Sequence, residues 1–258
     1  MRFASDFKKY INYALYSAAA ELKNQVHGTY LGWVWWILDP LLYMAVYSFV
    51  VEGVFGAKIE NFSVFVFIGL SAWNYFSASA NSSVSVVRSY RSVLQKAYIP
   101  KFILVLIVMF INFFKMALSF AILIAAMAAM GLKLQLAALC FFPLIAVYSA
   151  LIFGLCLISA HIGVYIADLS NVTVVATRVL FYFSGIFYDL KELPQKLMPV
   201  YFYVCPTGFF VRELRACLLY AQPCDFKMLA YWLTVAALVS LTGLSLMYRN
   251  ENSYMKAV

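Results

Sequence analysis

Charged residues are scarce in this chain of 258 residues. Aspartate, glutamate, lysine and arginine make up 12% of it, about half the share of an ordinary soluble domain. Apolar residues make up 65%. This composition predicts an all-α integral membrane protein, because lipid requires every backbone polar group to be satisfied within a helix or a closed barrel. We expect a single transmembrane domain over residues 1–258, with no length left for a separate soluble domain.

The groups on which most enzymes depend are also missing. No stretch matches the phosphate-binding pattern G-x-x-x-x-G-K-[ST], so the chain is not expected to hydrolyse ATP by itself. His27 and His161 are the only histidines, and neither accompanies a nucleophile pattern. The predicted spans hold no paired carboxylates, which argues against an enzyme that acts on lipid-linked sugars. We expect a transport protein that takes its energy from a partner or from an ion gradient.

Metal and nucleic-acid ligands are not expected either. The five cysteines form no C-x-x-C motif and lie near no histidine cluster, so no metal site is predicted. The net charge of +8 comes without a basic run interleaved with polar residues. Basic loops on the cytoplasmic side of a membrane account for this charge better than nucleic acid does.

Hydrophobic runs predict six transmembrane helices, of which the fifth is only just long enough to span. Six spans place both termini on one side of the membrane. More of the lysine and arginine residues fall on that side, so the positive-inside rule places both termini in the cytoplasm. The expected spans are residues 33–55, 62–87, 102–130, 136–162, 172–188 and 229–247.

Two further segments are expected outside the spans. Residues 1–30 should form an amphipathic interface helix, because apolar residues recur every three or four positions opposite a charged face; it could lie in the headgroup plane or pack on a partner protein. Residues 189–227 contain two short apolar stretches separated by prolines. They predict an extracytoplasmic re-entrant helical hairpin between spans five and six.

The sequence does not decide the role of the polar side chains inside two of the expected spans, the second and the third. Lys115 and Asn112 fall near the middle of the third span, where a lysine has either a functional or a structural role. Small polar residues on the second span favour either close helix packing or a wet passage. These residues are Ser71, Ser77, Ser79, Asn81, Ser82, Ser83 and Ser85.

The first span opens on a tryptophan-rich stretch typical of a membrane–water interface. Leu31 and Gly32 come first, then Trp35 or Trp36, then residues 39–42 (Asp-Pro-Leu-Leu) and residues 46–50 (Val-Tyr-Ser-Phe-Val). This pattern resembles the first span of ATP-binding-cassette (ABC) permeases that export capsule, O-antigen or teichoic acid polysaccharides. Asp39 stands where that family often has asparagine. Length, span number and loop placement extend the resemblance over most of the chain.

The resemblance implies a permease of the bacterial cytoplasmic (inner) membrane that works as a homodimer. Two copies of a separate ATPase subunit would bind ATP and magnesium, and the substrate would be a polysaccharide or lipid-linked glycan. It also makes residues 88–101 a cytoplasmic coupling loop, in which Arg91 to Lys96 would form one or two helical turns before Pro100. A plain basic loop on anionic lipid is the alternative. The coupling residues are Tyr90, Arg91, Ser92, Val93, Leu94, Gln95 and Lys96.

Aromatic residues make up 18% of the chain, and their flat faces suit the apolar C–H faces of sugar rings. Lipid-facing aromatic belts are the alternative for each of them. The expected channel aromatics are Tyr30, Trp33, Trp36, Tyr43, Tyr47, Trp73, Phe181 and Tyr182. The resemblance makes residues 189–227 a gate, with Tyr188, Asp189, Pro206, Arg212 and Arg215 as its residues.

Two other transport functions stay open at this point. One is an ABC permease for drugs or small lipids, which differs only in its substrate. The other is a carrier driven by an ion gradient, which would use Lys115 and Asp39 as its intramembrane charges.

Overall fold

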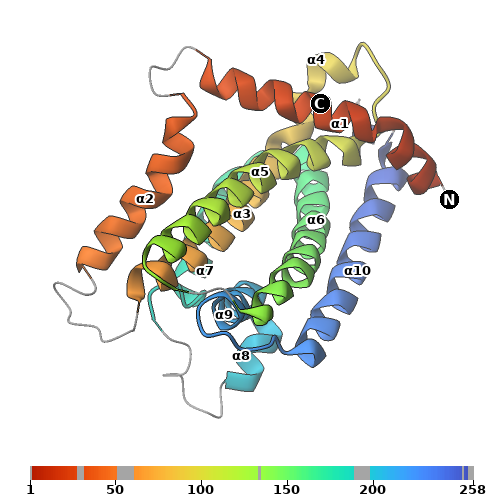
Figure 1. Ribbon diagram of the computed structural model, residues 1–258. Coiled ribbons are helices and arrows are strands. Elements are labelled where there is room, and N and C mark those ends of the chain that lie inside the picture. The colour runs from red at the N-terminus through yellow and green to blue at the C-terminus, as the bar shows by residue number, and fades with distance from the viewer. Residues whose placement is uncertain are drawn as a thin grey trace.

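The computed structural model describes residues 2–27, 32–50, 61–132, 135–188, 198–251 and 253–254. Within these ranges every regular element is a helix (Figure 1). Four helical segments are long and apolar enough to cross a membrane. They are α3 (Phe62–Ser89), α5 (Lys101–Ala129), α6 (Phe141–Tyr165) with the 3-10 turn η2 (Leu136–Cys140) before it, and α10 (Phe226–Arg249).

The second, third, fourth and sixth predicted spans are therefore confirmed as membrane-length helices. The other two predicted spans coincide with shorter apolar helices of 15 residues each, α2 (Val34–Ser48) and α7 (Leu169–Phe183). About 20 residues are needed to cross the hydrocarbon core. Residues 51–55, the end of the first predicted span, lie outside the described residues.

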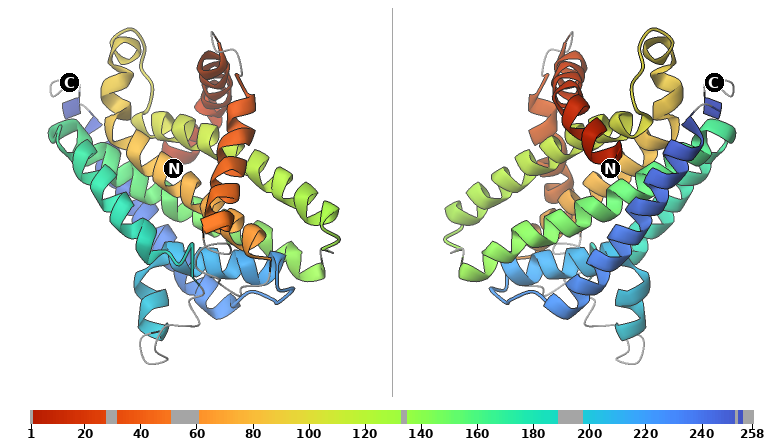
Figure 2. Two further views of the ribbon diagram at one scale, coloured as in Figure 1. Left: turned by 90° about the vertical axis from the view of Figure 1, so that its left-hand side faces the viewer. Right: turned by 90° about the vertical axis from the view of Figure 1, so that its right-hand side faces the viewer.

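Helix α3 is the centre of the bundle and packs on both α5 and α6 (Figures 1 and 2). Its first half is almost completely buried. On the far side of α6, α10 packs along most of its length through small residues. Ser240 Oγ donates to Ala150 O at 2.9 Å, and a Cβ atom at Gly154 would lie 2.6 Å from Ser240 N. Backbones approach this closely only where side chains are small.

This crossing predicts a stability defect for Gly154→Val. The added side chain would have to push α10 away from α6, and overpacking of this kind costs about 1–3 kcal/mol. A thermal unfolding midpoint in detergent would measure the change. Ala146→Leu is the control, because Ala146 is exposed on the same helix and should leave the midpoint nearly unchanged. Equal midpoints for the two variants would contradict the close crossing.

The predicted N-terminal amphipathic helix is present as α1 (Arg2–Val26), which lies across one end of the bundle (Figure 1). We call this the α4 end, because the short helix α4 (Arg91–Leu94) lies there too. Helix α1 packs mainly on α5, with its Ala14 and Ala18 buried. The opposite face exposes Tyr16 and Leu15.

The opposite end of the bundle carries the predicted hairpin. Residues 189–197 lie outside the described part, but the two short helices expected after them are present as α8 (Met198–Val204) and α9 (Pro206–Leu218). Helix α9 packs against α3, α6 and η2, and its Phe209, Phe210 and Leu214 are completely buried. It is therefore part of the core. The depth of the hairpin in the outer leaflet stays a prediction.

Candidate functional site

The polar side chains of α3 lie in three places: in a groove beside α7, in a cavity beside α1 and α5, and in the core. Trp73, Ser77 and Asn81 follow one another at intervals of four residues and so lie on one side of the helix. They face α7 across a cavity of about 550 Å³, which we call the aromatic groove. Its lining residues are Tyr43 from α2, Trp73, Ser77 and Asn81 from α3, and Val174, Thr177, Arg178, Phe181 and Tyr182 from α7.

Aromatic rings form one wall of this groove. The rings of Trp73 and Phe181 are tilted with their centroids 5.5 Å apart, and those of Phe181 and Tyr182 meet edge to face at 5.6 Å. Tyr182 is 70% exposed and Trp73 is buried. Because the set runs from the core to the surface, a ligand could slide along it without a single tight site.

A polar group lies beside the rings. Asn81 Nδ2 donates to Thr177 Oγ1 at 3.4 Å, while the buried Asn81 Oδ1 accepts no hydrogen bond from the described residues. A buried acceptor without a donor costs about 1–3 kcal/mol, but this oxygen has almost no accessible surface, so a ligand would reach it only if the Asn81 side chain turned. Arg178 is the charged residue of the lining. The groove thus combines apolar faces, polar side chains and a cation.

Four of the eight predicted channel aromatics line the groove: Tyr43, Trp73, Phe181 and Tyr182. Two do not, because the N-terminal part of α2 faces elsewhere. The Trp36 ring lies against α5, 6.1 Å from Phe114 and edge to face with it, and Trp33 is exposed at the start of α2. Tyr30 and the side chain of Tyr47 lie outside the described part of the chain.

Sequence reasoning found the aromatic residues of α7, Phe181 and Tyr182, but missed Val174, Thr177 and Arg178. Val174, Thr177, Arg178 and Phe181 have the spacing of one helix face and all line the groove. That spacing was visible in the sequence. Which neighbour the face meets depends on the packing of α7 against α3, which no local pattern encodes.

The other polar residues of α3 divide between packing and a second cavity. Ser79 and Ser83 are completely buried, and Asn112 Nδ2 donates to Ser79 Oγ at 3.2 Å, which joins α3 to α5. Ser82 and Ser85 instead line a polar cavity of about 760 Å³ between α1, α3 and α5. Ser79 and Ser83 thus serve helix packing, and a wet passage along the other residues stays a prediction.

Lys115 lies beside that second cavity and is held by neighbouring helices. Its Nζ donates to Gln25 Oε1 of α1 at 2.8 Å and lies 5.5 Å from the centroid of the Trp36 ring of α2. These contacts join α1 and α2 to α5. Asp39 is exposed on α2.

The predicted coupling residues form a projection at the α4 end. The expected helical turn is present as α4, and Figure 2 shows it beyond the ends of the long helices. Leu94 is buried and anchors it. Burial raises the pKa of the half-buried Tyr90 phenol above its ordinary value. The exposed residues are Arg91, Ser92, Val93, Gln95 and Lys96.

Among the predicted gate residues, Arg215 lies inside the bundle. It is 3% exposed and donates to three carbonyl oxygens: those of Phe65 at 3.0 Å, Gly185 at 2.7 Å and Ile186 at 2.8 Å. It therefore joins α9 to the start of α3 and to the segment after α7. Pro206 is the first residue of α9, Tyr188 Oη donates to Tyr182 O at 3.1 Å, and Asp189 lies outside the described residues.

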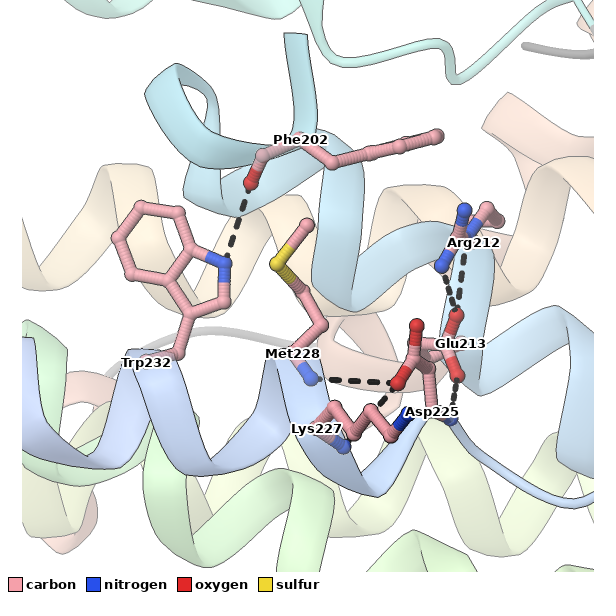
Figure 3. Close-up of polar contacts among 7 residues, drawn as sticks. All are labelled: Phe202, Arg212, Glu213, Asp225, Lys227, Met228 and Trp232. Carbon is pink, nitrogen blue, oxygen red and sulfur yellow. Dashed lines mark hydrogen bonds and ion pairs between the residues drawn. The ribbon is translucent and has the colours of Figure 1, made fainter. Parts of the chain in front are cut away.

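Arg212 and its neighbours tie α8, α9 and α10 together (Figure 3). Arg212 pairs with the buried Glu213, and its guanidinium lies 3.9 Å from the centroid of the Phe202 ring. Glu213 Oε2 also accepts from Asp225 N, at the start of α10, at 2.8 Å. Trp232 Nε1 donates to Phe202 O at 3.2 Å. These contacts fix the hairpin helices to the core.

Comparisons with known proteins agree with this architecture. The family model described as "ABC-2 type transporter" matches residues 15–219. An O-antigen export system permease protein RfbA of Klebsiella pneumoniae is 24% identical over 177 residues, 68% of each chain. Another RfbA, of Myxococcus xanthus, is 26% identical over 193 residues, 75% of this chain and 74% of that protein. Since the family match covers most of the sequence, the chain belongs to the ABC-2 type transporter family, as its non-catalytic transmembrane permease subunit.

Proposed function

We propose that this chain is the transmembrane half of an ATP-driven exporter that moves a cell-surface polysaccharide, in lipid-linked form, across the bacterial cytoplasmic membrane. The observation that carries the proposal is the aromatic groove, in which the rings of Trp73, Phe181 and Tyr182 lie beside polar side chains. The similarity to proteins named O-antigen export permeases supports it.

The groove matches the chemistry of a glycan. A sugar ring has apolar C–H faces that pack on aromatic side chains and a rim of hydroxyl groups that donate hydrogen bonds. The rings of Trp73, Phe181 and Tyr182 offer the first kind of contact, and the polar side chains of Ser77 and Asn81 beside them offer the second. Arg178 suits an acidic sugar or the phosphate of a lipid linkage, because a guanidinium pairs with such anions in a bidentate manner.

A second copy of the chain would close the groove. The outer faces of α2 and α7 expose a large apolar surface, and these two helices also contribute groove residues. A pathway wide enough for a glycan therefore fits between two protomers of a homodimer. The exposed apolar residues of these faces are Leu42, Val46, Phe49, Val172, Val175, Val179 and Phe183.

ABC-2 permeases pair with ATPase subunits, on which ATP binds. In this chain we assign the docking of two ATPase copies to α4, with its exposed Arg91, Val93 and Lys96, and to the adjoining α1. The α4 end then faces the cytoplasm, and both termini lie on that side. Family membership favours ATP over an ion gradient. A permease for drugs or small lipids would differ in substrate, which the export assay below distinguishes.

The groove assignment predicts a selective loss of export in Tyr182→Ala. Tyr182 is 70% exposed in the groove, so its removal should leave folding intact while it lowers the export rate about three- to tenfold, as expected for a lost aromatic contact. The readout is the surface polysaccharide of the host strain carrying this variant in place of the wild type.

Phe142→Ala is the matched control, because Phe142 is 69% exposed on α6 and does not line the groove. Normal surface polysaccharide in both variants would contradict the groove assignment. Normal surface polysaccharide in a strain that lacks the chain altogether would contradict the proposed substrate class.

A further inference from the structure

The residues at and after the end of α10 contact α1, the end of α6 and the segment that leads from α4 into α5. Helix α10 carries no groove residue and no coupling residue. We propose that residues 248–251, 253 and 254, which we call the C-terminal bridge, tie the coupling loop and the α6–α7 turn into one body. Glu251 and Tyr254 are then positioning residues for the coupling movement. This inference rests on the proposed function in taking α4 as the ATPase contact.

The first contact of the bridge is with the segment between α4 and α5. Glu251 is 8% exposed, and its Oε1 accepts from Tyr98 Oη at 2.8 Å and lies 4.0 Å from Lys101 Nζ. Tyr98 and Lys101 flank Pro100, where the chain leaves the coupling loop and enters α5. A buried carboxylate and a buried ammonium are costly unless paired, so this arrangement holds the loop against the bridge.

The second contact is with the last turn of α6. Tyr254 is completely buried, and its hydroxyl lies 2.5 Å from His161 Nδ1. Its ring also packs on that of Tyr165, with the centroids 6.1 Å apart. Helix α7, which supplies the wall of the aromatic groove, begins only four residues after Tyr165, at Leu169. The bridge therefore contacts the chain just before the groove helix.

The third contact is with α1. Tyr248 Oη donates to Asp6 Oδ2 at 2.9 Å, and the Tyr248 ring packs on Phe102 with the centroids 5.8 Å apart. Phe102 in turn lies 5.1 Å from the ring of Phe3. Side chains within seven residues of sequence thus bind α1, the coupling loop and α6. A displacement of α4 by the ATPase would carry the α6–α7 turn with it through this body.

A direct hydrogen bond between α3 and α6 provides a second route by which movement could reach α7, and the bridge is tested against it. Arg88 Nη2 donates to Val164 O at 3.0 Å, close to the same α6–α7 turn. If the displacement of α4 reached α7 through this hydrogen bond alone, the bridge would only stabilise the C-terminal residues. Substitutions at Arg88 and in the bridge therefore distinguish the two routes.

Hydrogen exchange of the full chain in lipid nanodiscs, with its ATPase subunits bound, tests the bridge. Glu251→Ala should raise exchange about tenfold at residues 97–103 and also at residues 164–170, which include or follow the α6 residues that Tyr254 contacts. Glu251→Gln keeps an acceptor for Tyr98 and should give a smaller rise at both places, so it serves if the alanine variant folds poorly. Tyr254→Phe should raise exchange at the same two segments, and Tyr16→Phe on exposed α1 should raise neither.

A merely structural role would raise exchange only next to each substituted side chain. That result, or a rise at residues 164–170 in Arg88→Ala but in neither Glu251 variant, would overturn the inference. Glycan exported per ATP hydrolysed should also fall several-fold in Tyr254→Phe with ATPase binding unchanged. Hydrogen exchange measures the mobility of the loops and does not depend on the substrate, whereas surface polysaccharide measures export. A failure of the bridge inference and a failure of the proposed function would therefore give different results.

Discussion

Replacing Arg215 with alanine should destabilise the fold by roughly 3–5 kcal/mol. The guanidinium is 3% exposed and donates to the carbonyl oxygens of Phe65, Gly185 and Ile186. Without it, three buried acceptors lose a charged donor and a cavity opens beside the Phe65 ring, whose centroid lies 3.3 Å from the guanidinium carbon. We expect the attachment of α9 to α3 to fail first.

Thermal unfolding of the purified protein in detergent measures this effect, and we expect a midpoint lower by about 10 °C. Arg215→Lys should be intermediate, because one ammonium keeps the charge but cannot reproduce the planar donor geometry toward three carbonyls. Arg249→Ala, at an exposed arginine of α10, should leave the midpoint unchanged. A midpoint for Arg215→Ala equal to that of the Arg249 control would show that the buried contacts do not hold the hairpin.

Reversing the charge of α4 with Arg91→Glu and Lys96→Glu together should weaken ATPase binding by roughly a hundredfold or more. Both side chains are exposed, so the substitutions should not affect folding. Like charges placed across an interface that evolved for opposite charges cost several kcal/mol. Leu94 is left in place, because it is buried and anchors the turn.

The dissociation constant of the purified ATPase subunit on the permease in nanodiscs is the measurement. Lys227→Glu is the control, since this exposed lysine lies at the start of α10, at the opposite end of the bundle. Unchanged affinity in the α4 variant, with the thermal midpoint of the wild type, would mean that the ATPase docks elsewhere. The plain basic loop would then be the correct interpretation of residues 88–101.

Much of this fold is predictable from the sequence, because long apolar helices have no other stable arrangement in lipid. The expected spans over residues 62–87 and 102–130 agree with α3 and α5 to within two residues at either end. The turn at Arg91 was also expected, since basic residues before Pro100 interrupt the hydrophobic run. In both cases the pattern lies within one stretch of the sequence, so it can be recognised without knowing which helices pack against it.

Other features depend on contacts between distant segments. Trp36 and Trp73 look alike as membrane aromatics, but only packing turns the first toward α5 and the second into the groove. Arg215 falls within the proline-rich region that the resemblance makes a gate, and only the packing of α9 against α3 shows that its side chain is buried. The contacts of Glu251 with Tyr98 and Lys101 join residues about 150 positions apart, with no periodic pattern to indicate them.

Purification of the tagged chain from its native host tests the central claim most directly. The account predicts that a nucleotide-binding subunit copurifies in stoichiometric amount and that the complex hydrolyses ATP. A homo-oligomer of this chain alone, isolated under conditions that preserve a known exporter complex, would contradict it. Transport driven by an ion gradient would then be the first function to examine, and Lys115 the first residue to substitute.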